Sequence, residues 1–550
     1  MLDATANVAG PGTLAAAPSS GTLSPAGPRE RRLVRSVLSN WGFSLVELFV
    51  GFAMPRLISD RLGQELLGVW DVSWSLVFWV RWTNLGVTGA VTRYVAHYRA
   101  LRDWARLNAS VNTSLAFLLL GCLLAVSLGG VFAALAPYML REPSPQAVNA
   151  AGWTIILLTA AAGLQMPAGV FNSVITGYER FDLLNVIRCT RDITVLLAVT
   201  GLLLTGGGLA ACAAVTLAAE MLASVAKYLV ARRICPHLRL SARYCRWQAA
   251  RELGLFGGKT VVRDLARGGI YHLSNLLVAG LLGPAAVAVY SRQRTLVMYL
   301  TRFVKQYANV FIPASSELHA AGDLPALRRM LVDSGRYAFY IALPPIWLLL
   351  LLGGPLVQTW MGPHYSATAV LSILVVGHAL TIPQTSAYSI LMGMSQHGAV
   401  ALYEGVALAL SAILGWLFLG PLQWGLCGAA LALVIPLTIS GGVLLPWVAC
   451  RRLGLPLPKY LYRVAIGPLT ASLPLLSVLG VVRAAPLPGP LSVLAIGVGL
   501  GTVVTALTYW HWVVPQPRKL RLMHNCARLG AWLWRLCRPG YGCRNVEVRS

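Results

Sequence analysis

Acidic residues, and charged residues in general, are scarce in this chain of 550 residues. Asp and Glu together number 19 and charged residues make up only 12%, whereas 57% of the residues are hydrophobic and the mean hydropathy is +0.66. These values lie far outside the range of soluble domains. Most of the surface must therefore face lipid rather than water, and the sequence predicts a polytopic integral membrane protein.

Several chemical motifs are absent as well. The chain has no Gly-rich loop ending in Lys-Ser or Lys-Thr, which argues against a built-in ATPase domain, and no His and Cys set with metal-ligand spacing. Its ten cysteines are scattered through apolar and basic segments, which argues against disulfides. A glycosyltransferase or polymerase, the enzyme alternative, would ordinarily need a folded extramembrane domain, and no segment between the predicted spans is long enough. We therefore expect no catalytic residues, no cofactor and no metal.

Apolar stretches of roughly 20 residues, the length of helix that crosses about 30 Å of hydrocarbon, recur along most of the chain. The alternation of polar and apolar residues that is typical of strands is absent. Because only helices and closed barrels satisfy every backbone group in lipid, the predicted fold class is an all-α helical bundle. We expect about fourteen spans, at residues 36–58, 66–92, 108–138, 148–176, 183–205, 208–231, 256–282, 285–313, 336–360, 366–394, 398–419, 424–449, 464–482 and 490–514.

The arginines are distributed unevenly between the loops, and short loops rich in Lys and Arg stay in the cytoplasm. The loops after even-numbered spans are basic, whereas those after odd-numbered spans hold only Arg56, Arg61, Arg141 and Arg483. Both termini are therefore predicted to be cytoplasmic. The asymmetry also explains most of the net charge of +26, which is thus no sign of nucleic-acid binding. The basic, amphipathic segment 518–538 should lie on anionic membrane lipids.

An internal repeat organises the chain. Residues 62–70 match residues 282–290 at an offset of 220, and the same offset pairs Asp103 with Asp323. A near-constant offset across six spans predicts two lobes in the same orientation, with the substrate site between them and rocking motion giving alternating access. The expected parts are a disordered cytoplasmic tail (1–32), an N-lobe of spans one to six (33–236), a cytoplasmic interfacial linker (237–255), a C-lobe of spans seven to twelve (256–456), spans thirteen and fourteen (457–514) and a basic cytoplasmic tail (515–550).

Two groups of motifs carry a resemblance to a known family. The run Leu66-Leu67-Gly68-Val69-Trp70 with Thr92-Arg93-Tyr94-Val95-Ala96, and Gly177-Tyr178-x-Arg180-Phe181-Asp182 after span four, resemble polysaccharide exporters of the multidrug/oligosaccharidyl-lipid/polysaccharide superfamily. Wzx-type O-antigen flippases are the nearest kind. The resemblance implies a flippase of the bacterial cytoplasmic (inner) membrane for an undecaprenyl-pyrophosphate-linked oligosaccharide, with a glycan polymerase and other surface-polysaccharide assembly proteins as partners. A lipid II-type flippase and a drug/cation antiporter of the same superfamily are the alternatives.

Charged residues inside spans are the candidates for a binding site, because each costs at least about 2.5 kcal/mol at mid-depth unless it faces a cavity or a partner. In span eight, four such polar residues fall with Ser291 on one face of an otherwise apolar helix. Guanidinium groups bind phosphate oxygens bidentately and keep their charge when desolvated. We therefore predict a cationic substrate-binding cavity between the lobes, lined by Arg81, Arg263, Arg267, Arg294, Arg302, Lys305 and Asn309.

Other roles for some of these charges stay open. Lys305 could extend to the lipid headgroups, and Arg263 could pair with the neighbouring Asp264. Glu47 and Arg267 are equivalent positions of the repeat and could pair across the lobes. Glu47 and Asp71 are also candidates for coupling transport to protons or sodium ions, the alternative to transport driven by the membrane potential alone.

Overall fold

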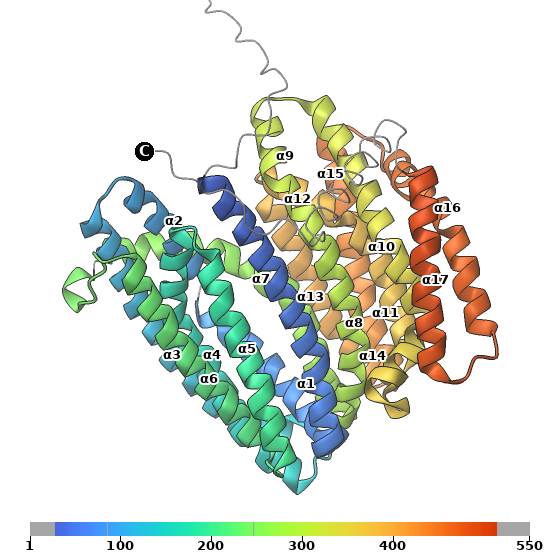
Figure 1. Ribbon diagram of the computed structural model, residues 1–550, viewed down its shortest axis with the longest axis horizontal. Coiled ribbons are helices and arrows are strands. Elements are labelled where there is room, and N and C mark those ends of the chain that lie inside the picture. Colours follow the sequence, from blue (N-terminus) through green and yellow to red (C-terminus); the bar gives the residue numbers. More distant parts are fainter. Residues whose placement is uncertain (1–27, 85, 246, 514–550) are drawn as a thin grey trace, which may run out of the picture.

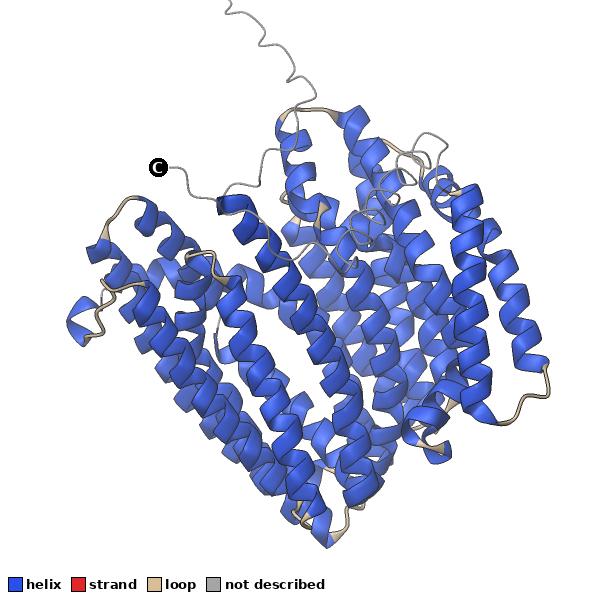
Figure 2. Cartoon of the chain, viewed as in Figure 1, coloured by secondary structure: helices blue, strands red, loops and turns tan. Residues whose placement is uncertain are grey.

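The structure, a computed structural model, describes residues 28–84, 86–245 and 247–513, and its regular secondary structure within those ranges is entirely helical (Figure 2). The predicted all-α fold class is confirmed. Ten helices of the described ranges are long and apolar enough to cross a membrane. Nearly all of the predicted tail 1–32 and the whole tail 515–550 lie outside the described residues.

The helices follow the predicted spans closely. The first half of the chain contains α1 (Pro28–Val80), η1 (Arg81–Asn84), α2 (Val87–Ala100), α3 (Trp104–Met139), α4 (Pro145–Gly177), α5 (Phe181–Leu204), α6 (Leu209–Ile234) and η2 (Ala242–Tyr244). The second half contains α7 (Trp247–Leu282), α8 (Pro284–Asn309), α9 (Phe311–Ala320), α10 (Leu324–Met361), η3 (Pro363–Tyr365), α11 (Thr368–Thr381), η4 (Ile382–Gln384), α12 (Thr385–Gly393), α13 (His397–Leu419), α14 (Gly425–Leu437), the π-helical η5 (Thr438–Leu444) and α15 (Leu445–Leu453). Helices α16 (Leu457–Ala484) and α17 (Gly489–Trp512) complete the described chain. Within the described residues, each predicted span overlaps one of these helices or a consecutive run of them.

The turns of the two halves share an unusual backbone conformation. Gly63 divides α1 into two antiparallel parts with φ 86° and ψ 175°, and Gly283, which is 220 residues further on, has φ 92° and ψ 166°. The same offset relates Asp103 to Asp323, and each of these carboxylates caps a helix by accepting from the backbone N–H three residues later. Local geometry therefore recurs at the offset of the sequence repeat. This recurrence supports the division into two six-span lobes, which stays a prediction.

The two groups of helices converge at one end and diverge toward the other (Figure 1). Helices α2 to α6, the first group, gather on one side of α1, and α8 to α15, the second group, lie on its other side, with α16 and α17 at the outer edge. The last two helices are fastened to α10, because Tyr509 Oη donates to the Tyr340 carbonyl at 2.6 Å and Trp347 Nε1 donates to Ser472 Oγ at 3.0 Å. They therefore pack as an addition to the second group.

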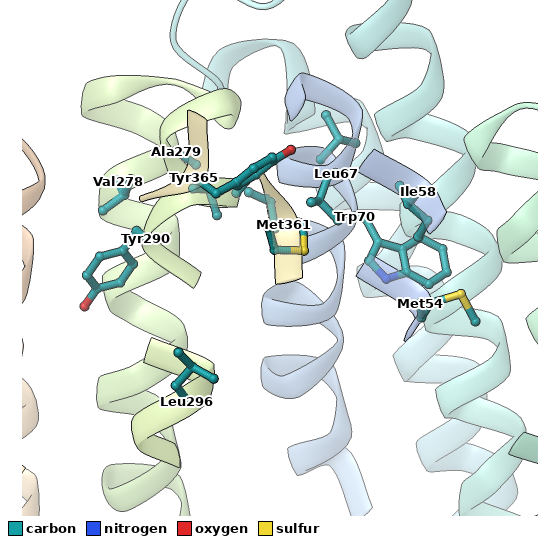
Figure 3. Close-up of a cluster of buried hydrophobic side chains, with 14 of the residues drawn as sticks. Met54, Ile58, Leu67, Trp70, Val278, Ala279, Tyr290, Leu296, Met361 and Tyr365 are labelled. Atoms are coloured by element: carbon teal, nitrogen blue, oxygen red, sulfur yellow. The ribbon is translucent and has the colours of Figure 1, made fainter. Parts of the chain in front are cut away.

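The groups are joined mainly near the turns at Gly63 and Gly283. Buried side chains of α1, α8 and α10 belong to one hydrophobic cluster there, and Figure 3 labels Leu67, Tyr290 and Met361 among them. Hydrogen bonds connect the same regions: Ser59 Oγ with Tyr365 Oη (2.6 Å), Trp360 Nε1 to the Phe52 carbonyl (2.8 Å), and both Arg56 Nη1 to the Trp360 carbonyl and Gln64 Nε2 to the Ala285 carbonyl (3.0 Å each). At about 1.5 Å of rise per residue, the α1 residues of these bonds lie within about 17 Å of Gly63. This end, which the arginine distribution predicts to be the outer one, is closed.

Gly68 is a sensitive position of the closed end, because a Cβ atom there would overlap the backbone carbonyl oxygen of Pro284. We expect Gly68→Ala to force α1 and α8 apart and to destabilise the fold by about 1–3 kcal/mol, the range for overpacking. Thermal unfolding in detergent measures this loss. Gly201→Ala is the matched control, since a Cβ at this helical glycine meets no heavy atom within 4 Å. Equal unfolding temperatures for the two variants would contradict the tight contact.

Candidate functional site

A cavity of about 510 Å³ lies within the first group of helices. Its walls come from α1, η1, α2, α4, α5 and α6, and its polar lining includes Arg81, Asn84, Thr88, Gln165, Asn172, Arg188, Arg191 and Lys227. Arg81 reaches the cavity because α1 gives way there to the short η1, and the chain then re-enters helical structure as α2. The cavity therefore gathers cationic and amide side chains inside a bundle of membrane-spanning helices.

A buried carboxylate organises two of the cations. Glu220, whose side chain is only 1% exposed, accepts from Lys227 Nζ at 2.8 Å and from Arg191 Nη1 at 2.7 Å. Gln165 Nε2 donates to the same carboxylate at 3.1 Å, and Arg191 Nε also donates to Asp192 at 2.9 Å. These shared bonds make the charges tolerable in the bundle, because a buried ion needs both a partner and satisfied hydrogen bonds. Both carboxylates are therefore occupied by the protein's own cations.

Arg81 and Arg188 are in a different situation. Among the described side chains, no carboxylate lies within 4 Å of either guanidinium, and the Arg188 guanidinium lies 5.7 Å from the ring centroid of Phe43. Arg188 is half-buried and Arg81 is exposed to the cavity. Each guanidinium carries five N–H donors in a fixed fork that matches phosphate and carboxylate oxygens. The cavity thus offers two planar anion-binding groups next to an already neutralised cluster.

The predicted site residues do not line one cavity but lie in several separate places. Arg81 lines the cavity, whereas Arg267 lies in a smaller pocket of about 90 Å³ between α7, α12 and α13. There its Nε is 3.6 Å from Glu404 Oε1 and its guanidinium is 4.1 Å from the Tyr388 ring centroid. The pairing of Arg267 with Glu47, which the repeat left open, is therefore absent from the structure: Arg267 lies beside Glu404 of α13, and Glu47 pairs with Arg302. The side chain of Arg263 lies outside the described part of the structure.

The stripe on α8 is divided between the interior and the surface. Arg294 is half-buried and donates to the carbonyl of Tyr271 on the neighbouring α7. Arg302, Lys305 and Asn309 are exposed toward the end of α8, and Arg302 Nη1 pairs with Glu47 Oε1 of α1 at 2.7 Å. Both side chains of that pair remain accessible, with exposed fractions of 55% and 42%. Their binding role stays a prediction.

A buried ion pair between α1 and α8 was not predicted from the sequence. Both carboxylate oxygens of Asp71 lie 2.6 Å from Arg292 Nη2, and the side chain of Arg292 is only 4% exposed. Arg292 lies off the polar stripe, so helical periodicity alone gave no reason to select it. The coupling roles proposed for Asp71 and Glu47 stay predictions, but each carboxylate already has an arginine partner.

Sequence reasoning also missed Arg188, Arg191 and Lys227. The signal was available, since all three are charged residues inside predicted spans five and six and intramembrane charges mark functional or structural sites. Their spacing forms no continuous stripe on one helix, because the cavity draws single residues from several helices. The periodicity of one span therefore could not group them.

The chain matches known proteins in sequence and in structure. Residues 154–370 match the model of a family described as "Polysaccharide biosynthesis protein". A protein of Shigella flexneri named "Putative O-antigen transporter" is 23% identical over 441 residues, which cover 76% of this chain and 98% of that protein. An inward-facing multidrug resistance MATE family transporter of the MOP superfamily has a TM-score of 0.66 at 15% identity, covering 74% of this chain and 95% of its own. The lipid II flippase MurJ in an inward closed conformation has a TM-score of 0.65 at 14% identity, covering 86% and 99%.

These likenesses first define a fold: the chain has the fold shared by a MATE family transporter of the MOP superfamily and by the lipid II flippase MurJ. Within that fold, residues 154–370 are similar to a family of polysaccharide biosynthesis proteins. The resemblance inferred from the sequence motifs is confirmed at this level.

Proposed function

We propose that the chain is a flippase that moves an anionic polyprenyl-pyrophosphate-linked oligosaccharide from the inner to the outer leaflet of a bacterial cytoplasmic membrane, for the biosynthesis of cell-surface polysaccharide. The observation that carries this proposal is the cavity with Arg81 and Arg188 on its wall and no described carboxylate within 4 Å of either. A pyrophosphate presents several acceptor oxygens at the spacing of a guanidinium fork. Removed from water, it needs fixed cationic donors of this kind.

The position of the cavity supports alternating access. Arg81 is 18 residues beyond Gly63 and Arg188 is 16 residues before Leu204, which places both about 24–27 Å from the closed end. With the basic loops in the cytoplasm, as predicted, the anion-binding groups lie toward the inner leaflet while the outer end is closed. This arrangement is the loading state of an exporter whose substrate is assembled in the cytoplasm.

The same site disfavours a drug/cation antiporter. A cationic drug requires available carboxylates, but Glu220 and Asp192 beside the cavity are both bound by the chain's own cations. Lipid II remains the second candidate substrate, because it also carries a pyrophosphate. The name of the Shigella flexneri relative and the matched family favour the oligosaccharide of a surface polysaccharide.

Binding to the purified protein tests the proposed substrate class. We expect undecaprenyl pyrophosphate to bind more tightly than undecaprenyl monophosphate, and undecaprenol and a lipophilic cation to compete weakly or not at all. The tail is shared by the three prenyl lipids, so the comparison isolates the charged group. Equal affinity for undecaprenol and the pyrophosphate would contradict a site built on arginines.

Labelling of single cysteines tests the orientation. In intact cells, a membrane-impermeant maleimide should label His364→Cys, which is exposed at the closed end, but not Arg243→Cys, which is exposed at the opposite end. Opening the membrane should expose both positions to the reagent and thereby shows that each cysteine is reactive. Labelling of Arg243→Cys in sealed cells would reverse the predicted orientation and with it the direction of the loading state.

A further inference from the structure

A second basic hollow lies in the other group of helices, between α10 and α16. It has a volume of about 810 Å³. The polar side chains that define it are Arg328, Arg329, Arg336, Arg463, Tyr340 and Tyr462. Asp333 is the one carboxylate among the lining residues, and it pairs with Arg336 at 2.8 Å. The hollow therefore has a strong positive charge that its own lining does not neutralise.

The four arginines differ in how far their hydrogen-bonding capacity is used. Arg328 Nε donates to the carbonyl of Leu453 at the end of α15, and Arg336 is held by Asp333. For Arg329 and Arg463, no carboxylate of the described part of the chain lies within 4 Å. Both are exposed. Arg329 of α10 and Arg463 of α16 therefore line the hollow from its two helices. Each guanidinium keeps N–H donors that no described carboxylate uses.

The hollow has a charged rim and an apolar deeper wall. Arg329 lies five residues into α10 and Arg463 six residues into α16, about 8–9 Å from the helix starts. Ile466 and Gly467 line the wall about one turn further in. A Cβ atom at Gly467 would lie only 3.0 Å from the Tyr340 hydroxyl, so the glycine leaves room for that hydroxyl. Tyr462 is 66% exposed, as expected of an aromatic ring at the boundary between headgroups and acyl chains.

We propose that this hollow binds the headgroup phosphate of an anionic phospholipid of the cytoplasmic leaflet, with Arg329 and Arg463 as its principal ligands and an acyl chain along the wall at Ile466. Both helices begin at the end that carries the basic loops, which is the predicted cytoplasmic surface. The apolar wall distinguishes the site from one for a free anion, since inorganic phosphate gains nothing from it. The hollow lies outside the first group of helices and is independent of the flippase proposal.

Native mass spectrometry of the delipidated full-length protein, titrated with phosphatidylglycerol or phosphatidylcholine, tests the proposal. We expect the wild type to retain phosphatidylglycerol preferentially, and the double variant Arg329→Ala with Arg463→Ala to lose about 25-fold in affinity for it, which corresponds to two lost surface charge contacts. Arg329→Lys with Arg463→Lys should retain an intermediate affinity, because the charge stays while the planar fork is lost.

The matched control is Arg232→Ala with Arg233→Ala, which removes the same charge from exposed positions at the same end of the molecule but in the first group of helices. It should bind phosphatidylglycerol as the wild type does. Three results would overturn the proposal: unchanged retention in the Arg329 and Arg463 double variant, equal retention of the two phospholipids by the wild type, or full displacement of phosphatidylglycerol by millimolar inorganic phosphate. The last result would assign the site to a free anion.

Discussion

Replacing Arg81 and Arg188 together by alanine should abolish glycan export while the protein still inserts and accumulates in the membrane. Each charged hydrogen-bonding contact contributes about 1.5–3 kcal/mol, so losing both should lower the rate by at least about 100-fold, at 1.36 kcal/mol per factor of ten. Surface glycan in a null strain complemented with each variant, normalised to the amount of membrane protein, measures the effect. Neither arginine is needed to neutralise a described carboxylate within 4 Å, so folding should survive the change.

Two comparisons separate binding from structure. Arg81→Lys with Arg188→Lys should restore part of the export, because charge returns without the bidentate fork. Arg302→Ala tests the alternative site on α8, where the exposed arginine pairs with Glu47 between the two groups of helices. Normal export in the Arg81 and Arg188 double variant, with loss of export in Arg302→Ala, would move the binding site from the cavity to the α8 stripe.

Removing the carboxylate of Asp71 should produce the largest loss of stability. Asp71→Ala leaves the guanidinium of Arg292, 4% exposed, without its partner in the interior. Breaking a buried pair in this way costs about 3–5 kcal/mol, whereas replacing both partners by apolar residues is often neutral. We therefore expect a much lower unfolding temperature in detergent for Asp71→Ala, and recovery of most of that loss in the double variant Asp71→Leu with Arg292→Met.

Asp60→Ala is the control for the Asp71 prediction. It breaks an ion pair with Arg56 whose side chains are 41% and 47% exposed, and pairs of this kind contribute only about 0–1 kcal/mol. If the apolar double variant of Asp71 and Arg292 is as unstable as Asp71→Ala, the pair is not an isolated electrostatic unit. Transport by a stable double variant would remove Asp71 from the candidates for ion coupling.

The helices were predictable because lipid imposes a strict local rule. Each span must be helical and mostly apolar, so composition and length located them, and the predicted spans leave Gly63 and Gly283 in the short segments between helices, where the structure has its turns. Breaks inside spans were harder to predict, such as η1 after Val80, where the Thr83 hydroxyl donates to the Val80 carbonyl at 3.0 Å, because apolar composition alone does not mark where a span stops being α-helical.

The candidate site was predicted only in part, for a related reason. Periodicity tells which residues share a face of one helix, but not which helix lies opposite that face. Arg294 and Arg302 share a stripe, yet one contacts a backbone carbonyl of α7 and the other a carboxylate of α1. Arg81, Arg188 and Lys227 come from three elements and meet only in the folded bundle. Charge inside a span was the reliable signal, and the grouping of charges required the tertiary structure.

Reconstituted translocation tests the central claim most directly. The purified protein in liposomes should move a polyprenyl-pyrophosphate-linked oligosaccharide between leaflets, as measured by the fraction of its sugar that becomes accessible to a lectin or glycosidase outside the vesicles. We predict translocation by the wild type, its loss in the Arg81→Ala and Arg188→Ala double variant, and wild-type rates in the Arg232→Ala and Arg233→Ala control. Translocation by the double variant at the wild-type rate, or a wild type that moves a lipophilic cation but not the pyrophosphate lipid, would contradict the account.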